Sequence, residues 1–214
     1  CQEHKVACRR VGKLIVAADE EEAERLVPLY ERAVKNGATG VHWVSSGEIA
    51  AHEPSVRAVA GLFFPSTGVV DAAGLVGTLA RLARAYGAEV FFGAEIKDLS
   101  YERGLIRVEV AYANGTSETF LAERLVNAAG LQSDRLARML EPDWSISIAP
   151  VRGEYYSFNC RARPELAFRG TNVYPVPPIL KVGRKERFVV GIHLTPTFEM
   201  AVDGQVKIGR KVLV

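Results

Sequence analysis

The sequence predicts a mixed fold of helices and strands, an α/β fold with α+β character, and three observations lead to it. The 214 residues and a hydrophobic share of 48% are enough to bury the core of one large domain or of two intertwined small ones. The middle of the chain has a β-α-β pattern, and residues beyond 148 show mainly strand patterns. A layered core with a partner domain inserted in pieces would produce this order.

Helix and strand signals alternate over the first part of the chain. Asp19 stands three residues before Glu22, and Ser45 stands three residues before Glu48, which is the spacing of a capping box at a helix start. Apolar residues at helical spacing follow the first pair, and we expect one helix that ends at Gly37. The expected strands are residues 10–17, 41–44 and 59–64.

The middle of the chain carries the clearest helix and the clearest hairpin. The helix opens at Asp71 and ends at Gly87, and its expected apolar face consists of Leu75, Val76, Leu79, Leu82, Ala83 and Tyr86. The turn residues Asn114 and Gly115 lie between two runs that predict a hairpin, residues 105–112 and 117–121. Further strands are expected at residues 90–99 and 124–129, and a helix at residues 133–140.

The last part of the chain is predicted to consist mostly of strands. These are residues 148–158, 172–176, 187–194 and 205–208. Residues 181–187 are polar and basic, so an exposed loop is expected there.

Composition and charge argue against several classes of protein. The formal net charge is +2 and there is no Lys/Arg tract, so nucleic acid is not expected as a partner. No apolar run approaches the roughly 20 residues of a membrane-spanning helix, so no transmembrane segment is expected. Cys1, Cys8 and Cys160 lack a Cys-x-x-Cys spacing, which favours free thiols and no metal site. The chain lacks an initiator Met, and we expect an internal piece of a longer protein.

The most informative motif is LVNAAGLQSD, residues 125–134. An apolar strand pattern delivers Ala128, Ala129 and Gly130 to the start of a predicted helix. Small residues let a backbone approach a flat or anionic ligand closely, and a helix start offers free N–H groups. The same pattern also suits an ordinary strand-to-helix turn, and the residues alone do not choose between the two.

This motif resembles a late strand-turn segment of the D-amino-acid-oxidase-like superfamily of FAD enzymes. Within that superfamily the sequence is most similar to the L-2-hydroxyglutarate dehydrogenase (oxidase) family. Seven blocks carry the resemblance in order: GKLIVA (12–17), EP (53–54), TGVVD (67–71), NAAGLQSD (127–134), PVRGEYY (150–156), NVYPVPP (172–178) and GIHLTP (191–196).

The resemblance implies part of an FAD-binding Rossmann-like domain with an inserted substrate domain built on a mixed or antiparallel sheet. Residues 71–148 would belong to the FAD-binding domain, and residues 1–70 and 149–214 to the substrate domain. A backbone group at Ile96 would meet the adenine. The turn residues that would pass close to the cofactor are Ala128, Ala129, Gly130 and Leu131.

One departure from the family pattern concerns the cofactor. The family opens with a Gly-x-Gly-x-x-Gly fingerprint that seats the pyrophosphate on a helix N-terminus, and no such motif occurs in these residues. We therefore expect FAD in the complete protein, whereas this chain alone is expected to bind FAD weakly or not at all.

The activity that the resemblance implies is oxidation of L-2-hydroxyglutarate to 2-oxoglutarate by hydride transfer to the flavin. His193 would be the catalytic base or hydroxyl contact, because its ordinary pKa lies near working pH. Arg152 would bind a substrate carboxylate, and Tyr174 would donate a hydrogen bond to the substrate. Each has a structural alternative: a histidine held within a sheet, a surface ion-pair arginine and a packing tyrosine.

Two other functions stay open at this point. One is a different enzyme of the superfamily that acts on an amino acid or on glycerol 3-phosphate, and the other is a substrate-side or interaction piece with no activity of its own. The electron acceptor is not encoded in any pattern. The family implies mitochondria for a eukaryotic protein, and the cytoplasm or the inner-membrane face for a bacterial one.

Overall fold

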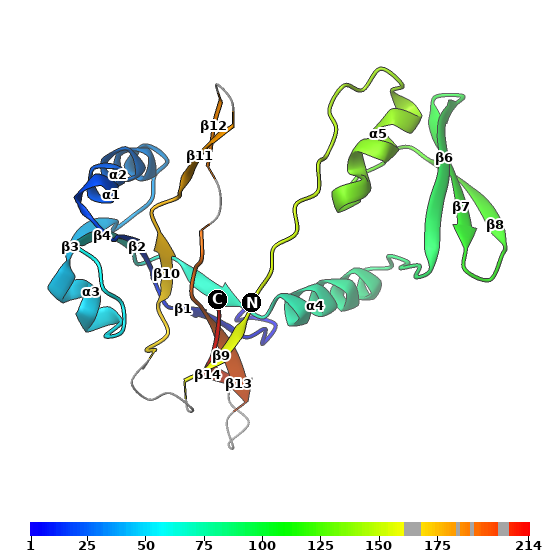
Figure 1. The fold of residues 1–214 in the computed structure, drawn as a ribbon. Coiled ribbons are helices and arrows are strands. Elements are labelled where there is room, and N and C mark those ends of the chain that lie inside the picture. The colour runs from blue at the N-terminus through cyan, green and yellow to red at the C-terminus, as the bar shows by residue number, and fades with distance from the viewer. Residues whose placement is uncertain (161–167, 183–184, 189–190, 201–205) are drawn as a thin grey trace. The chain divides into compact units, whose positions relative to one another are not determined.

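The computed structural model describes residues 1–160, 168–182, 185–188, 191–200 and 206–214 (Figure 1). The chain forms two compact units. Unit 1 consists of Cys1–Arg81 and Glu154–Val214, and unit 2 consists of Leu82–Gly153. The boundaries of the two units follow residues 81 and 153, and the predicted assignment of residues 1–70, 71–148 and 149–214 to two domains stays a prediction.

A four-stranded sheet in the order β10-β2-β4-β3 forms the centre of unit 1. Its strands are β2 (Lys13–Ala17), β3 (His42–Ser45), β4 (Ala60–Phe64) and β10 (Asn172–Pro175). β10 runs parallel to β2, whereas β4 is antiparallel to both β2 and β3. The strands predicted at residues 10–17, 41–44, 59–64 and 172–176 are confirmed, with ends shifted by up to three residues.

Alternation along the strands gives this sheet two apolar faces. Leu14 and Val173 are buried on one face together with Ile49 of α3 (Ser46–His52). Ala17 and Leu62 are buried on the other face, together with Leu26. Leu26 opens α2 (Leu26–Lys35), which follows α1 (Glu20–Glu24). Figure 1 shows α1 and α2 side by side and α3 apart from them. Each fully buried leucine contributes roughly 1.5–3 kcal/mol to folding.

The two predicted capping patterns form as expected. The Asp19 side chain accepts a hydrogen bond from the backbone N–H of Glu22 at 2.9 Å. Ser45 and Glu48 make a reciprocal capping box, in which the Glu48 carboxylate accepts from the Ser45 backbone N–H at 2.7 Å. Each cap satisfies N–H groups that have no partner within the helix. Asp71 also caps a helix, because its carboxylate accepts from the Gly74 N–H at 3.0 Å.

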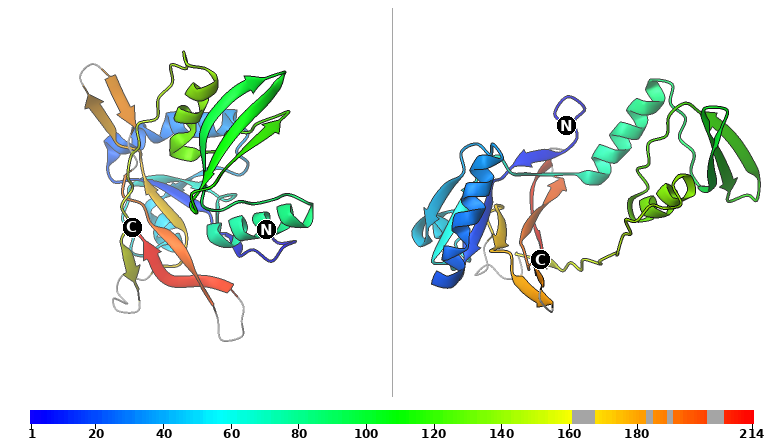
Figure 2. Two further views of the ribbon diagram at one scale, coloured as in Figure 1. Left: turned by 90° about the vertical axis from the view of Figure 1, so that its right-hand side faces the viewer. Right: turned by 90° about the horizontal axis from the view of Figure 1, so that it is seen from above.

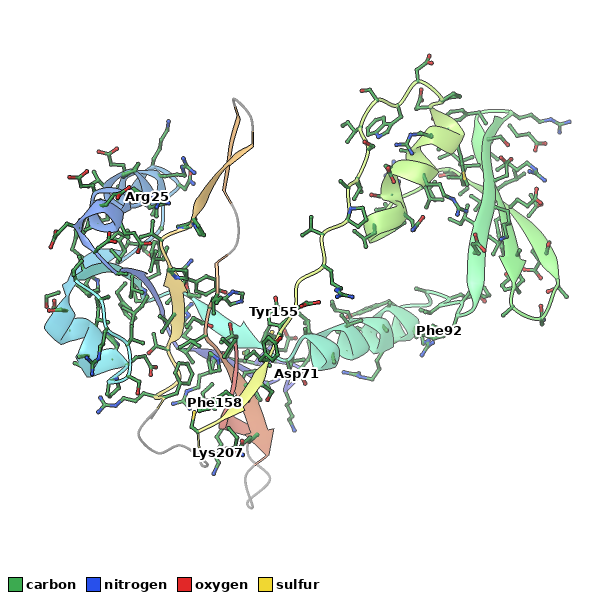
Figure 3. All side chains as sticks on the ribbon, in the orientation of Figure 1. Arg25, Asp71, Phe92, Tyr155, Phe158 and Lys207 are labelled. Carbon is green, nitrogen blue, oxygen red and sulfur yellow. The ribbon has the colours of Figure 1, made fainter. Side chains whose placement is uncertain are left out.

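The single helix predicted from Asp19 to Gly37 is wrong, because the structure breaks it at Arg25. A continuous helix would need an N–H at Pro28 for the carbonyl of Glu24, and proline has none and its ring would clash there. α1 accordingly ends at Glu24. Arg25, which is labelled in Figure 3, stands at the break. Its side chain donates a hydrogen bond to the carbonyl of Pro177, and this bond ties the helix pair to the segment after β10.

Three smaller sheets complete the described part of unit 1. β1 (Cys8–Arg10) pairs with β5 (Gly68–Val70), β11 (Ile179–Val182) pairs with β12 (Lys185–Phe188), and β14 (Val206–Leu213) lies between β13 (Thr195–Met200) and β9 (Ser157–Asn159). All of these pairs are antiparallel.

Several predictions for the last part of the chain are wrong. The loop expected at residues 181–187 is part of the β11-β12 pair, with residues 183–184 outside the described part of the chain. Of the strand expected at residues 148–158, only residues 157 and 158 lie in β9. Tyr156 exchanges two backbone hydrogen bonds of 2.9 Å with Val214, but none of the described strands pairs with residues 148–155. Of the strand expected at residues 187–194, Arg187 and Phe188 lie in β12, residues 191–193 lie in no strand, and residues 189–190 are outside the described part.

Unit 2 contains an antiparallel sheet in the order β6-β7-β8. Its strands are β6 (Ala94–Glu102), β7 (Leu105–Tyr112) and β8 (Ser117–Ala122), and they confirm the predicted hairpin with its turn at Asn114-Gly115. α5 (Ser133–Leu140) follows η1 (Gly130–Gln132) and lies beside the sheet (Figure 2). Leu99 and Val108 of the sheet pack against Leu136 and Met139 of α5. The strand expected at residues 124–129 pairs with none of the described strands, so that prediction is wrong.

The helix predicted after Asp71 is confirmed as α4 (Ala72–Ala85), which begins in unit 1 and ends in unit 2. Its expected apolar face is not buried: Val76 is 66% exposed and Leu79 is 56% exposed. Among the described helices of the chain, none is both long and apolar enough to span a membrane.

Replacement of Gly12 should destabilise unit 1 more than replacement of Gly37. Both glycines have positive φ, +74° and +76°, so an alanine at either position costs about 1–2 kcal/mol. At Gly12 the new Cβ would also overlap the Phe63 ring, whereas nothing lies within 4 Å of the Cβ position at Gly37. Phe63 cannot swing away freely, because its ring contacts those of His42 and His52.

We expect Gly12→Ala to cost about 1–3 kcal/mol more than Gly37→Ala. Denaturant unfolding followed by Trp43 fluorescence, in a Trp144→Phe background, reports on unit 1 alone, since Trp43 lies in β3. Equal losses for the two variants would show that the Phe63 contact is unimportant.

Candidate functional site

The structure brings together two of the predicted substrate-side residues in unit 1. Tyr174 lies on β10, opposite Ile15 of β2. His193 is held beside it by a backbone bridge in which Val173 and Leu194 exchange hydrogen bonds of 3.0 and 2.8 Å. The rings of Tyr174 and His193 stack with centroids 4.6 Å apart and planes 8° apart.

A third ring completes this aromatic group. Tyr155 meets His193 edge to face, with centroids 5.9 Å apart and an angle of 84° between the planes. It comes from the segment that leads into β9 (Figure 3). The Nδ1 atom of His193 lies 3.3 Å from the carbonyl oxygen of Gly191. In the tautomer with a proton on Nδ1, that nitrogen donates to Gly191 and Nε2 is left free to accept a proton.

Lys13 adds a positive charge next to the same ring. Alternation places Lys13 on the face of β2 that carries Ile15 and Ala17, and α1 and α2 pack at the Ala17 end of that face. The Lys13 ammonium lies 4.7 Å from the centre of the Phe64 ring and 5.6 Å from that of the Tyr174 ring. Burial lowers the pKa of this ammonium below its ordinary value.

A groove of about 370 Å³ in unit 1 is lined in part by Tyr174. Its other lining residues are Asn172 of β10, Thr67–Val70 around β5, Thr195–Phe198 of β13, and Leu213 of β14. Asn172 itself is buried and donates to the carbonyl of Gly12 at 3.1 Å. The volume is within the range of pockets that hold small organic ligands.

Sequence reasoning missed Lys13 and Tyr155 as members of this group. Both lie in motifs that support the family resemblance, GKLIVA and PVRGEYY, but neither was assigned a role. The available signal was the charge of Lys13 at the start of an otherwise apolar strand. Alternation alone could have placed it on the same face as Ile15.

In unit 2 the predicted cofactor-side turn is held by its own side chains. The Asn127 amide donates to the carbonyl of Ser133 at 2.8 Å, and its oxygen accepts from the Ala129 N–H at 3.3 Å. The Ser133 hydroxyl donates to the carbonyl of Gly130 at 2.8 Å. Gly130 has a φ of +55°, in the left-handed region that favours glycine. These bonds fix the turn just before α5.

The surface of this turn fits a close approach by a flat or anionic group. Ala128, Gly130 and Leu131 are exposed, and Leu131 keeps 64% of its surface. No atom lies within 4 Å of the position that a Cβ would take at Gly130. A ligand could therefore reach the backbone here without displacing protein atoms.

The remaining predicted residues lie elsewhere. Ile96 lies on β6, an outer strand of the β6-β7-β8 sheet, beside an irregularity of pairing between Ile96 and Asp98. Its carbonyl accepts a hydrogen bond from Arg135 at 3.4 Å. Arg152 is exposed near the end of unit 2, outside any helix or strand. Arg152 belongs to unit 2, whereas Tyr174 and His193 belong to unit 1, and its predicted role stays a prediction.

Comparison with known proteins identifies the family of this chain. The family described as "FAD dependent oxidoreductase" (DAO) matches residues 1–212. The chain belongs to this family. The resemblance inferred from the motifs is therefore confirmed, and FAD is the cofactor on which members of the family depend.

Curated relatives with the same name recur across bacteria and animals. L-2-hydroxyglutarate dehydrogenase of Escherichia coli strain K12 is 28% identical over 98% of the chain, and the mitochondrial enzyme of that name from Homo sapiens is 30% identical over 98%. The Caenorhabditis elegans relative is 33% identical over 90%. The chain spans only 45%, 44% and 42% of these three proteins, less than half of each.

Solved structures confirm a mixed α/β fold shared with FAD-dependent oxidases. L-α-glycerophosphate oxidase from Mycoplasma pneumoniae matches with a TM-score of 0.75 and 24% identity, over 98% of this chain and 50% of that one. Glycine oxidase from Geobacillus kaustophilus matches with a TM-score of 0.71 and 23% identity, over 99% and 49%. At these identities the likeness establishes the fold alone.

Proposed function

We propose that this chain is the substrate-side part, together with some of the cofactor-side part, of an FAD-dependent dehydrogenase or oxidase of L-2-hydroxyglutarate. The observation that carries the proposal is the stack of His193 on Tyr174, with Lys13 beside the same tyrosine ring. A base, a hydroxyl donor and a cation are the groups that a 2-hydroxy acid needs. The names of the relatives support this choice of substrate.

Oxidation of the 2-hydroxy acid removes a hydride from C2 and a proton from its hydroxyl, and a C=O bond forms. FAD, when bound, accepts the hydride. In our proposal His193 accepts the hydroxyl proton at Nε2, while Gly191 holds the ring through Nδ1. The Tyr174 hydroxyl donates a hydrogen bond to the substrate, and Arg152 binds one of its carboxylates.

The cofactor-side residues of the proposal are Ile96, through its backbone, and the turn of Ala128, Ala129, Gly130 and Leu131. The open space at Gly130 and the exposed backbone around it fit this role. Because the 214 residues contain no Gly-x-Gly-x-x-Gly, the motif that would bind the pyrophosphate of FAD is not among them. We expect the isolated chain to be colourless or only weakly yellow after purification in excess FAD.

Substrate screening of the complete enzyme tests the function. By the complete enzyme we mean a polypeptide of the relatives' full length that contains this chain. Under anaerobic conditions, L-2-hydroxyglutarate should bleach the bound flavin, and glycine and glycerol 3-phosphate should not. Bleaching by glycine or glycerol 3-phosphate but not by L-2-hydroxyglutarate would instead identify an enzyme of the same family with another substrate. A flavin-containing enzyme that none of these substrates reduces would contradict all three substrate assignments.

A further inference from the structure

Lys13 is a partly buried cation that lies beside two aromatic rings. Among the described residues no carboxylate forms an ion pair with it, and the groups that surround its ammonium are the aromatic rings of Phe64 and Tyr174. Aromatic faces attract a cation more weakly than a carboxylate does at the same depth. Burial without an anion is unfavourable for an ammonium, and the lowered pKa of Lys13 has that cause.

The position of Lys13 is fixed by the sheet. It lies on β2, directly opposite Phe64 of β4 and Asn172 of β10. Both neighbouring strands are hydrogen-bonded to β2. A lysine on a central strand has its backbone held on both sides, so only its side chain can adjust to a ligand.

Lys13 and His193 both lie against the ring of Tyr174. The ammonium is 5.6 Å from the ring centre and the imidazole centroid is 4.6 Å from it. A short dicarboxylate could therefore place its hydroxyl at His193 and a carboxylate at Lys13. An anion at that position would supply a counter-charge that none of the described residues provides, and it would favour the protonated lysine.

We infer that Lys13 binds a carboxylate of the substrate and thereby contributes to the preference for an anionic 2-hydroxy acid. This inference rests on the proposed function, and it assigns a role to a residue that the sequence motifs left without one. Its role is binding: the lysine holds the substrate before and during the reaction and takes no proton from it.

Protection from acylation tests the contact directly. The complete enzyme with FAD bound is treated with limiting acetic anhydride, and acetylation of each lysine is measured by mass spectrometry with and without saturating 2-oxoglutarate, the product. We expect 2-oxoglutarate to slow acetylation of Lys13 severalfold and to leave Lys35 unchanged. Lys35 is the internal control because it is an exposed lysine of the same unit. Unprotected Lys13 overturns the inference.

Kinetics of the variants give a second readout. Lys13→Met should raise the KM for L-2-hydroxyglutarate roughly ten- to hundredfold, the loss expected for one charge-assisted hydrogen bond, with little change in kcat. Lys13→Arg should recover most of the loss because it keeps the charge. Lys35→Met removes the same charge from the surface and should leave KM unchanged. A KM in Lys13→Met equal to the wild-type value overturns the inference.

A failure of the Lys13 inference can be distinguished from a failure of the proposed function. If L-2-hydroxyglutarate fails to bleach the flavin but glycine or glycerol 3-phosphate succeeds, the proposed substrate is wrong. The acylation experiment is then repeated with the oxidised product of the substrate that bleaches, and protection of Lys13 supports an anion site at this residue while its absence overturns it. If Lys13→Met does not fold, the acylation of the wild-type enzyme still decides.

Discussion

Replacement of His193 with alanine should lower the turnover of the complete enzyme by about 10²–10⁴-fold while FAD remains bound. This is the usual contribution of a positioned general base. The imidazole is fixed from two sides, by its stack on Tyr174 and by the contact of Nδ1 with Gly191. Removal of the ring leaves no described group in that position to accept the hydroxyl proton.

His52→Ala is the matched control. His52 also lies in unit 1 and also stacks on an aromatic ring, that of Phe63, with centroids 4.4 Å apart. His52→Ala and His193→Ala therefore both remove a histidine that stacks on an aromatic ring, and they differ in where that histidine lies in unit 1. Flavin absorbance measures FAD retention, and anaerobic rapid mixing with L-2-hydroxyglutarate measures the reductive step. Near-normal turnover in His193→Ala would refute its role as base.

Replacement of Glu53 with alanine should lower the free energy of unfolding of unit 1 by about 2–4 kcal/mol. The Glu53 side chain is only 1% exposed, and its two carboxylate oxygens accept the backbone N–H groups of Arg169 at 2.7 Å and Thr171 at 2.6 Å. Alanine would leave both N–H groups without an acceptor, and a buried donor without a partner costs about 1–3 kcal/mol. Trp43 fluorescence in the Trp144→Phe background measures the loss.

Glu31→Ala serves as the control for the removal of a glutamate, since Glu31 is exposed on α2. It should change the unfolding free energy by no more than about 0.5 kcal/mol. If Glu53→Ala costs as little as Glu31→Ala, the two hydrogen bonds between Glu53, which follows α3, and residues 169–171 do not stabilise unit 1.

The contribution of Glu53 should also depend on pH. Burial raises the pKa of its carboxyl above the ordinary value, although the hydrogen bonds from Arg169 and Thr171 act in the opposite direction. The folded state then holds the proton more tightly than the unfolded chain does. The stability that wild type has over Glu53→Gln is therefore greatest below the ordinary glutamate pKa, about 4.3, and declines as pH rises through the raised pKa. If the stability of wild type relative to Glu53→Gln instead increases as pH rises through this range, the pKa of Glu53 is lowered and not raised.

Local patterns in the sequence predicted the fold well wherever a few neighbouring residues determine the structure. The capping pairs at Asp19 and Ser45 and the Asn114-Gly115 turn depend on side chains close in sequence, and each forms as expected. Pro28 should have indicated the break between α1 and α2, but the helical spacing of apolar residues obscured it.

Predictions failed where pairing depends on distant strands. The sequence patterns at residues 124–129 and 148–155 suit a strand, but a strand also needs a partner for its backbone groups, and composition does not supply one. The prediction for residues 181–187 failed in the opposite way, since it missed strands that form. The polar side chains indicated a loop, although β11 and β12 pair through the backbone. At the site, motif resemblance identified Tyr174 and His193 as candidates, and only the structure revealed their stacking and the nearby Lys13.

The parallel pairing of β2 with β10 joins opposite ends of the chain. The Asn172 side chain bonds to Gly12 across a separation of 160 positions, and Thr171 bonds to Glu53 across 118. In the sequence, unit 2 lies entirely between the residues that these bonds join, and its own sheet is built from strands that follow one another along the chain. During synthesis on the ribosome, unit 2 therefore has all its residues before unit 1 does. The Lys13–Tyr174–His193 group is completed only after residue 193 emerges, so assembly of this group is a late event, with a large loop-closure entropy to overcome.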